Sequence, residues 1–180
     1  MRDGPRADLC ERMLAGQLDL ALLVETPELH ERLHRYRLFS ERYVMIFPPG
    51  HRFETHAAVS VDDLTEECLL LHEDVACPAR RFISDAWTRN NTAPRRQHFA
   101  NSQAQLLEMV HADLGVSVAG ERLPAATPLL RRPIDVTSDA RIVMLATVAG
   151  RPMGPTPSLF SKLLRGRAWS ADMPAAAEAA

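Results

Sequence analysis

The sequence predicts an α/β fold made of two lobes, because an amphipathic helix twice runs into a glycine and then directly into a short apolar strand. These two helix–strand units are Asp8–Leu23 and Asn101–Gly120. In the second unit Leu106 and Val110 recur at a spacing of four, which places an apolar stripe on one face of a helix. Two such units far apart in the chain favour two α/β lobes over one helical bundle.

The second unit also carries signals for the ends of its helix. Asn101 or Ser102 can cap the first turn, and Gly115 fits the left-handed position that ends a helix. Residues 116–118 (Val-Ser-Val) then have the small and β-branched character of a buried parallel strand.

The first unit predicts a helix from about Arg6 to Ala15, ended by Gly16, and an interior parallel strand at Leu18–Leu23, because that run is nearly all apolar. Elsewhere, helices are expected after proline or capping signals, and strands where short apolar runs occur. The expected helices begin near Thr26, Ser60, Pro78 and Thr156, and the expected strands are Tyr43–Phe47, Cys68–Leu71, Leu129–Ile134 and Ile142–Val148. Strands that alternate with helices favour largely parallel sheets.

The composition narrows the class of protein. With 180 residues, of which 46% are hydrophobic, the chain can bury a core in one domain or in two small lobes. The net charge of −2, with acids and bases interspersed, gives no basic field that would attract nucleic acid. No apolar run approaches the ~20 residues of a membrane span, and the first residues lack an apolar signal-peptide core. Cys10, Cys68 and Cys77 show no metal-ligand spacing and are typical of a reduced, cytoplasmic protein.

Several segments, in their order along the chain, resemble the effector-binding domain of LysR-type transcriptional regulators. They are Leu14–Leu23, Leu38–Phe53, Val59–Leu64, Cys77–Trp87, Asn101–Val118, and finally Leu129–Ile134 and Arg141–Leu145 with the closing helix; the whole match runs from about Gly4 to Arg167. The resemblance implies a two-lobed, type 2 periplasmic-binding-protein-like α/β fold. The first lobe is incomplete, because the family's first two strands and the helix between them are not in this sequence. The implied function is a regulatory domain that senses a small-molecule effector, with no catalysis and no cofactor.

The resemblance also implies an organisation and a set of partners. It assigns residues 1–42 and 136–168 to the partial first lobe, 43–47 and 129–135 to the crossings between lobes, 48–128 to the second lobe, and 169–180 to a disordered tail. It implies a cytoplasmic homo-oligomer that contacts no membrane and reaches DNA only through a helix-turn-helix domain absent from this sequence. A free-standing solute-binding module is the alternative with the same fold.

The expected ligand site lies where strands end and helices begin. In an open α/β lobe, ligands sit beyond the carboxyl ends of the strands, and the helix N-termini there offer free N–H groups that suit an anion. With the resemblance, this places the effector, an organic anion, against Pro5, Arg6, Val24, Ala76, Cys77, Asn101, Ser102, Val118 and Ala119. Arg80 is expected to add positive charge at this site.

A zinc hydrolase is a further hypothesis, because residues 30–34 read His-Glu-Arg-Leu-His. On a helix, His30 and His34 would share a face and could bind zinc, with Glu31 polarising a water molecule. Charged residues in and around the motif are unusual for such enzymes, and neither His51 nor Glu54 stands out as a third ligand. We therefore expect a chance match on a surface segment, with no metal and no catalytic residues.

Cys77 is expected at a helix start, where the helix dipole and the neighbouring Arg80 and Arg81 favour a thiolate. Peroxide-sensing relatives hold a cysteine in this loop, so a redox sensor is one interpretation. Such a sensor needs a resolving cysteine one or two turns along the helix, and Phe82–Trp87 contains none. A cleft-lining or packing role is therefore favoured.

Overall fold

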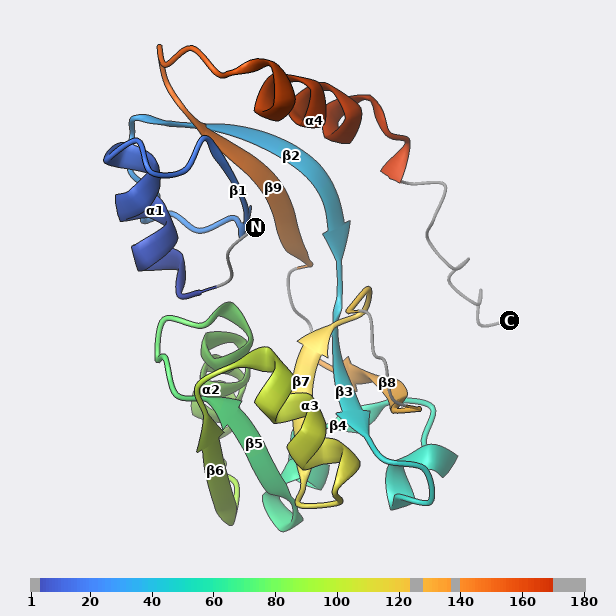
Figure 1. Ribbon diagram of the computed structural model, residues 1–180. Coiled ribbons are helices and arrows are strands. Elements are labelled where there is room, and N and C mark those ends of the chain that lie inside the picture. Colours follow the sequence, from blue (N-terminus) through green and yellow to red (C-terminus); the bar gives the residue numbers. More distant parts are fainter. Residues whose placement is uncertain (1–3, 124–127, 137–139, 170–180) are drawn as a thin grey trace. The chain divides into compact units, whose positions relative to one another are not determined.

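The computed structural model describes residues 4–123, 128–136 and 140–169 of the chain (Figure 1). The chain divides into two compact units: a larger unit of Met1–Pro5 and Glu41–Arg141, and a smaller unit of Arg6–Ser40 and Ile142–Ala180. The ranges 43–47 and 129–135, expected to be the crossings, fall within the larger unit. From Ser170 on, the expected disordered tail lies outside the described residues.

The larger unit contains a six-stranded mixed sheet. Its strands, in spatial order, are β4 (Val59–Ser60), β8 (Leu130–Asp135), β3 (Tyr43–Phe47), β7 (Val116–Gly120), β5 (Cys68–His72) and β6 (Arg96–Ala100). Neighbouring strands are parallel in the β7–β5–β6 half and in the β4–β8 pair, whereas β3 is antiparallel to both of its neighbours. In this described sheet the prediction of largely parallel pairing is therefore right for three of the five strand pairs, and both antiparallel pairs involve β3.

Two helices cover opposite faces of this sheet. The helix α2 (Pro78–Asn90) buries Ile83 against Leu69 and Val118, and the helix α3 (Gln103–His111) buries Leu106 against neighbouring positions of the same strands. Because side chains alternate between the faces of a strand, β5 and β7 send one set of apolar residues to each helix. The two helices are confirmed as predicted, and Figure 1 shows them on the two sides of the strands.

Two short 3₁₀ helices, η1 (Arg52–Thr55) and η2 (Asp62–Glu66), complete this unit. The predicted capping signal at Ser60 is confirmed. The Ser60 hydroxyl donates to Asp63 Oδ2 at 2.7 Å and accepts from the Asp63 N–H at 3.1 Å. These reciprocal bonds fix the turn that begins η2.

Gly115 is required for a different reason from the one predicted. The left-handed residue after α3 is Asp113, with φ 58°, and Gly115 follows with φ 156°. A Cβ on Gly115 would lie 2.2 Å from the carbonyl oxygen of Cys68. The glycine therefore permits β7 to run close beside β5, and a short polar residue that tolerates the left-handed region ends the helix.

The smaller unit contains a three-stranded sheet in the order β1–β9–β2. Its elements are β1 (Leu20–Val24), β9 (Arg141–Val148), β2 (Leu33–Glu41), α1 (Arg6–Leu14) and α4 (Pro155–Gly166). The helix α1 packs Met13 against Ala21 and Leu23 of β1. The prediction of an interior parallel strand here is wrong: β1 pairs antiparallel with β9 and forms an edge of the described sheet. Its apolar character reflects burial beneath α1 on one face, while Leu22 on the other face is 49% exposed.

The helix expected after Thr26 is also absent from the structure. The chain makes turns around Pro27 and Glu31 and then enters the long strand β2 (Leu33–Glu41). The local helix-start signal is overridden because β2 hydrogen-bonds to β9 in the sheet. The motif at residues 30–34 therefore lies in a turn and a strand, so its two histidines do not share a helix face.

Candidate functional site

The carboxyl ends of three parallel strands meet at one edge of the larger unit's sheet. His72 at the end of β5 is in register with Ala100 at the end of β6, and the Glu73 N–H donates to the Ala100 carbonyl at 2.8 Å. On the side of β5 away from β6, Leu70 of β5 pairs with Ser117 of β7. The loops that follow these strands therefore leave the sheet side by side, as the sequence predicted for a ligand site in an open α/β lobe.

Ser102 caps the helix that begins at this edge. Its Oγ accepts from the Gln105 N–H at 3.2 Å, and the Asn101 N–H donates to Gln105 Oε1 at 3.2 Å. Ser102 is half-buried and Asn101 is exposed. The first turn of α3 contains no acidic residue, so its positive dipole end is not neutralised from within the helix.

Cys77 lies at the position before α2, and its thiol is not part of a disulfide. The loop that leads to it is held by its own hydrogen bonds. Asp74 accepts from the Ala76 N–H at 2.8 Å through Oδ1 and from the Cys77 N–H at 3.0 Å through its carbonyl. Both Ala76 and Cys77 keep partial exposure. These two residues and the Asn101–Ser102 pair are thus brought to the same edge.

Arg80, which was expected to add positive charge at this edge, is held by contacts within the protein. Its Nη1 donates to the backbone carbonyl of His72 at 3.0 Å and to that of Glu73, and its guanidinium lies 4.7 Å above the ring of Phe99. These contacts hold the ends of β5 and β6 together. The helix N-termini at this edge also favour an anion, because their free N–H groups carry the positive ends of the helix dipoles.

Val118 and Ala119 lie in β7 at the same edge, but their side chains point into the two hydrophobic layers. Val118 is 4% exposed and packs on the α2 side, whereas Ala119 is 3% exposed and packs on the α3 side. The whole of β7 through Gly120 is buried, and partial exposure begins at Glu121.

The remaining expected residues divide between the units. Pro5 is exposed and belongs to the larger unit, and Arg6 and Val24 belong to the smaller one. Arg6 Nη1 donates to Thr26 Oγ1 at 2.7 Å, and Nη2 lies 4.0 Å from Glu28 Oε2. Arg6 at the start of α1 is therefore tied to the turn that follows β1, the strand that ends at Val24.

A charged group beside β7 was missed by the sequence analysis. Glu41 is 3% exposed and is paired with Arg141, whose guanidinium lies 5.6 Å from the ring centre of Tyr43. Burial raises the pKa of Tyr43 to about 12, and the positive charge of Arg141 offsets part of this effect. Glu41 and Arg141 are a hundred residues apart, so no local pattern in the sequence could have joined them.

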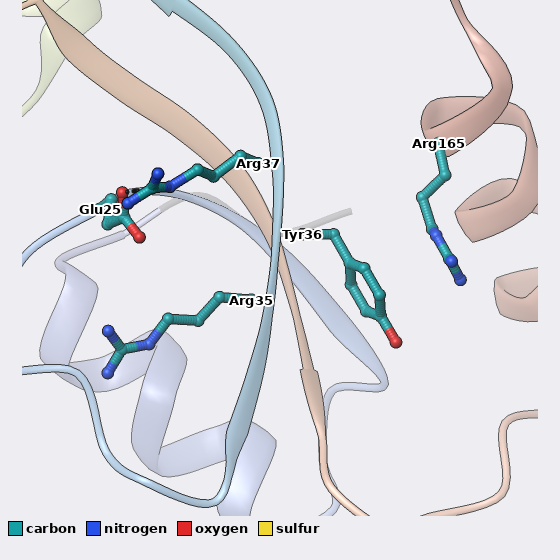
Figure 2. Close-up of a pocket in the computed structure, with 5 residues that line it drawn as sticks. All are labelled: Glu25, Arg35, Tyr36, Arg37 and Arg165. Carbon is teal, nitrogen blue, oxygen red and sulfur yellow. Dashed lines mark hydrogen bonds and ion pairs between the residues drawn. The ribbon is translucent and has the colours of Figure 1, made fainter.

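The smaller unit has an open pocket of its own, with a volume of about 510 Å³ (Figure 2). It is lined by Glu25, Arg35, Tyr36, Arg37 and Arg165. Arg35 and Arg37 project to one side of β2, and Tyr36 projects to the other side, toward Arg165. Arg37 Nε donates to Glu25 Oε2 at 2.9 Å, and the Arg165 guanidinium lies 4.1 Å from the Tyr36 ring centre. Because the three guanidinium groups do not converge on one point, this pocket is a weaker candidate than the strand edge.

The described residues also bear on the metal and membrane hypotheses. Within residues 4–123, 128–136 and 140–169, no three His, Cys, Asp or Glu side chains gather in an arrangement that could hold a metal ion. His30 Nδ1 instead accepts the Arg32 N–H at 3.1 Å. None of the helices in these ranges has the length and apolar character needed to span a membrane.

Comparison with known proteins assigns the family. The family model "LysR substrate binding domain" matches residues 1–169. The uncharacterized HTH-type transcriptional regulator YwqM of Bacillus subtilis (strain 168) is 28% identical over 111 residues, which are 62% of this chain and 37% of YwqM. This chain thus spans little more than a third of the length of that relative.

Solved structures of LysR regulators share the fold. HinK, a LysR family transcriptional regulator from Pseudomonas aeruginosa, matches with a TM-score of 0.76 and 22% identity, over 92% of this chain and 57% of HinK. The regulatory domain of CcmR from Synechocystis PCC6803, solved in complex with 2-PG, matches with a TM-score of 0.72 and 19% identity, over 88% of this chain and 77% of that one. The predicted periplasmic-binding-protein-like α/β fold is confirmed. Since the family model spans nearly the whole sequence, this chain belongs to the LysR substrate-binding domain family.

Proposed function

We propose that this chain is the effector-sensing part of a LysR-type transcriptional regulator and that it binds a small molecule without catalysing a reaction. The observation that carries the proposal is the edge where β7, β5 and β6 end together, fixed by the register of His72 with Ala100. Two helices begin at this edge, at Pro78 and at Gln103. The CcmR regulatory domain, which shares this fold, was solved with the small molecule 2-PG.

An organic anion is the ligand class that this edge favours. The first turns of α2 and α3 both lack acidic residues, and their N–H groups carry the positive ends of the helix dipoles. Asp74 caps the loop before α2 and brings negative charge to that side. We therefore place the anionic group of the effector nearer to Ser102 than to Cys77.

The remaining parts of the proposal concern the longer protein. Control of transcription requires contact with DNA, and the slightly acidic composition of this chain favours contact through another segment. We propose that the regulator works in the cytoplasm as a homo-oligomer. A change in the position of the lobes on effector binding would then alter the geometry of the DNA-binding parts.

A thermal-shift screen of organic acids on the purified protein tests the site. A ligand at 100 times its dissociation constant stabilises the folded state by ~2.7 kcal/mol. We expect this ligand-dependent increment to shrink in Ser102→Ala, which removes the hydroxyl at the edge, and in Cys77→Trp, which adds a bulky ring at the same edge.

The matched control is Ser60→Ala. The Ser60 hydroxyl also accepts a backbone N–H in the first turn of a helix, that of Asp63, but Ser60 lies in β4 at the opposite end of the sheet order. Both serine variants should lose about 1 kcal/mol of stability without ligand, because each loses a cap. Only Ser102→Ala should lose part of the ligand increment. A binder whose increment is the same in the wild type, Ser102→Ala and Cys77→Trp would contradict the proposed site.

A further inference from the structure

Oppositely charged residues stand where the chain passes between the two units. Glu41 ends β2 and is the first residue of the long segment in the larger unit, and Arg141 begins β9 and is the last. Glu41 Oε1 accepts hydrogen bonds from Arg141 Nε at 2.8 Å and from Nη2 at 2.5 Å. The Glu41 side chain is 1% exposed and that of Arg141 20%. A buried ion pair with two hydrogen bonds therefore joins the two places where the chain passes between the units.

The same carboxylate also holds the end of β7. Glu41 Oε2 accepts the backbone N–H of Arg122 at 2.6 Å, two residues beyond the last residue of β7. Beside it, the Glu121 N–H donates to the carbonyl of Arg42 at 3.0 Å. Both oxygens of Glu41 are therefore bonded, one to Arg141 and one to the loop after β7.

The guanidinium of Arg141 rests on a surface that only glycine provides. A Cβ on Gly120 would lie 2.1 Å from Arg141 Nη2 and 2.4 Å from Cζ. The ring of Tyr43 lies near the same guanidinium and stacks on Phe82 of α2, with ring centres 4.3 Å apart. The position of Arg141 is thus fixed by Glu41, by Gly120 and by a ring that is anchored in the core of the larger unit.

We propose that Glu41, Arg141 and Gly120 form a clamp that fastens both chain passages to the end of β7, so that movement between the units bends the chain on the Ser40 and Ile142 side of the clamp. Removing one partner of a poorly hydrated ion pair destabilises the folded state, because the other charge then stays buried and unpaired. The clamp therefore keeps β3 and β8 part of a rigid larger unit. This inference goes beyond the proposed function and does not depend on which ligand binds.

Amide hydrogen exchange measured by mass spectrometry tests the clamp. Glu41→Gln keeps the size of the side chain but removes the charge, and Gly120→Ala leaves both charges but occupies the place of the guanidinium. We expect both variants to speed exchange in the segments around Glu41, Arg122 and Arg141 by about tenfold or more, because these amides would open locally. Exchange within the helix α2 should stay as in the wild type.

Two controls make the result decisive. Glu54→Gln makes the same chemical change in a surface carboxylate, which accepts the Gly50 N–H at 2.8 Å, and should leave the three segments unchanged. In the wild type the Arg122 amide should be as protected as those of β3, although Arg122 lies outside helices and strands. Fast exchange at Arg122 in the wild type would overturn the proposal. So would wild-type exchange at the clamp in Glu41→Gln, or an increase that extends equally through α2.

Discussion

Inside the larger unit, the hydroxyl of Ser117 donates a hydrogen bond of 2.7 Å to the backbone carbonyl of Leu70. Ser117 is 1% exposed and belongs to the central strand β7, and Leu70 belongs to the neighbouring strand β5. The hydroxyl therefore has a partner where water has no access, and it ties together two of the strands that form the candidate site.

Replacement of Ser117 tests this bond. We expect Ser117→Ala to lower the free energy of unfolding by about 1 kcal/mol, the usual net value of a hydrogen bond, because alanine leaves little space behind. Ser117→Val should cost more, since it adds a methyl group to a packed layer as well as losing the bond. Urea denaturation measures both values. Equal stability of the wild type and Ser117→Ala would contradict the assigned bond.

Gly115 offers a second test of how β7 and β5 approach each other. Gly115→Ala should lower the free energy of unfolding by several kcal/mol, because the alanine Cβ would lie 2.2 Å from the Cys68 carbonyl oxygen. Gly50→Ala is the matched control: Gly50 has φ 84°, but its Cβ would meet nothing within 4 Å. That variant should lose only about 1 kcal/mol through its backbone conformation. Similar losses in the two variants, measured in urea, would contradict the close approach.

The raised pKa of Tyr43 predicts that the free energy of unfolding depends on pH in the alkaline range. The folded state raises its pKa from 10.0 to about 12, so between these values the folded protein holds a proton that the unfolded chain has lost. The contribution of Tyr43 to the free energy of unfolding is therefore at its full value below about pH 10. It falls by roughly 2–3 kcal/mol as the pH rises toward 12. The free energy of unfolding should fall less steeply with pH in Tyr43→Phe, which keeps the ring but has no ionisable group. The same slope in both proteins would rule out Tyr43 as its source.

The uncharged edge strand β1 is expected to pair with other copies of this chain. Residues Leu20–Val24 carry no charge, and Leu22 is 49% exposed, whereas the other edge strand of this sheet, β2, carries Arg35 and Arg37. Charged side chains protect an edge strand from pairing with other chains, and β1 lacks them. We expect oligomers in sedimentation velocity experiments and a shift toward monomer in Leu22→Lys. The circular dichroism of the variant should stay unchanged. A clean monomer for the wild type would contradict this reading of β1.

Local signals in the sequence predicted the helices around the candidate site well. Proline at the first position of α2 and Ser102 before α3 act within one turn of the chain, so their effect can be read from neighbouring residues. The apolar stripe through Leu106 and Val110 likewise reported which face of α3 is buried. The edge of the sheet followed from these elements, because parallel strands bring their carboxyl ends together.

What the sequence could not reveal depends on contacts between distant segments. The apolar run in β1 indicated burial but not its strand partner, so its antiparallel pairing with β9 was missed. The helix-start signal at Thr26 was weaker than the pairing of β2 with β9. Arg80 was expected to face a ligand, and only the folded chain shows it bonded to the carbonyl of His72.

The most direct test of the central claim is a map of where an organic acid from the screen contacts the isotope-labelled protein, read from amide chemical shifts in a titration. We predict that the shifts at saturation centre on Ala76, Cys77, Ser102 and Gln103, where the loops after β5 and β6 leave the sheet. They should shrink in Ser102→Ala and persist in Ser60→Ala. Shifts confined to the smaller unit, around Arg35 and Arg37, would contradict the assignment of the effector site to the edge of the three parallel strands.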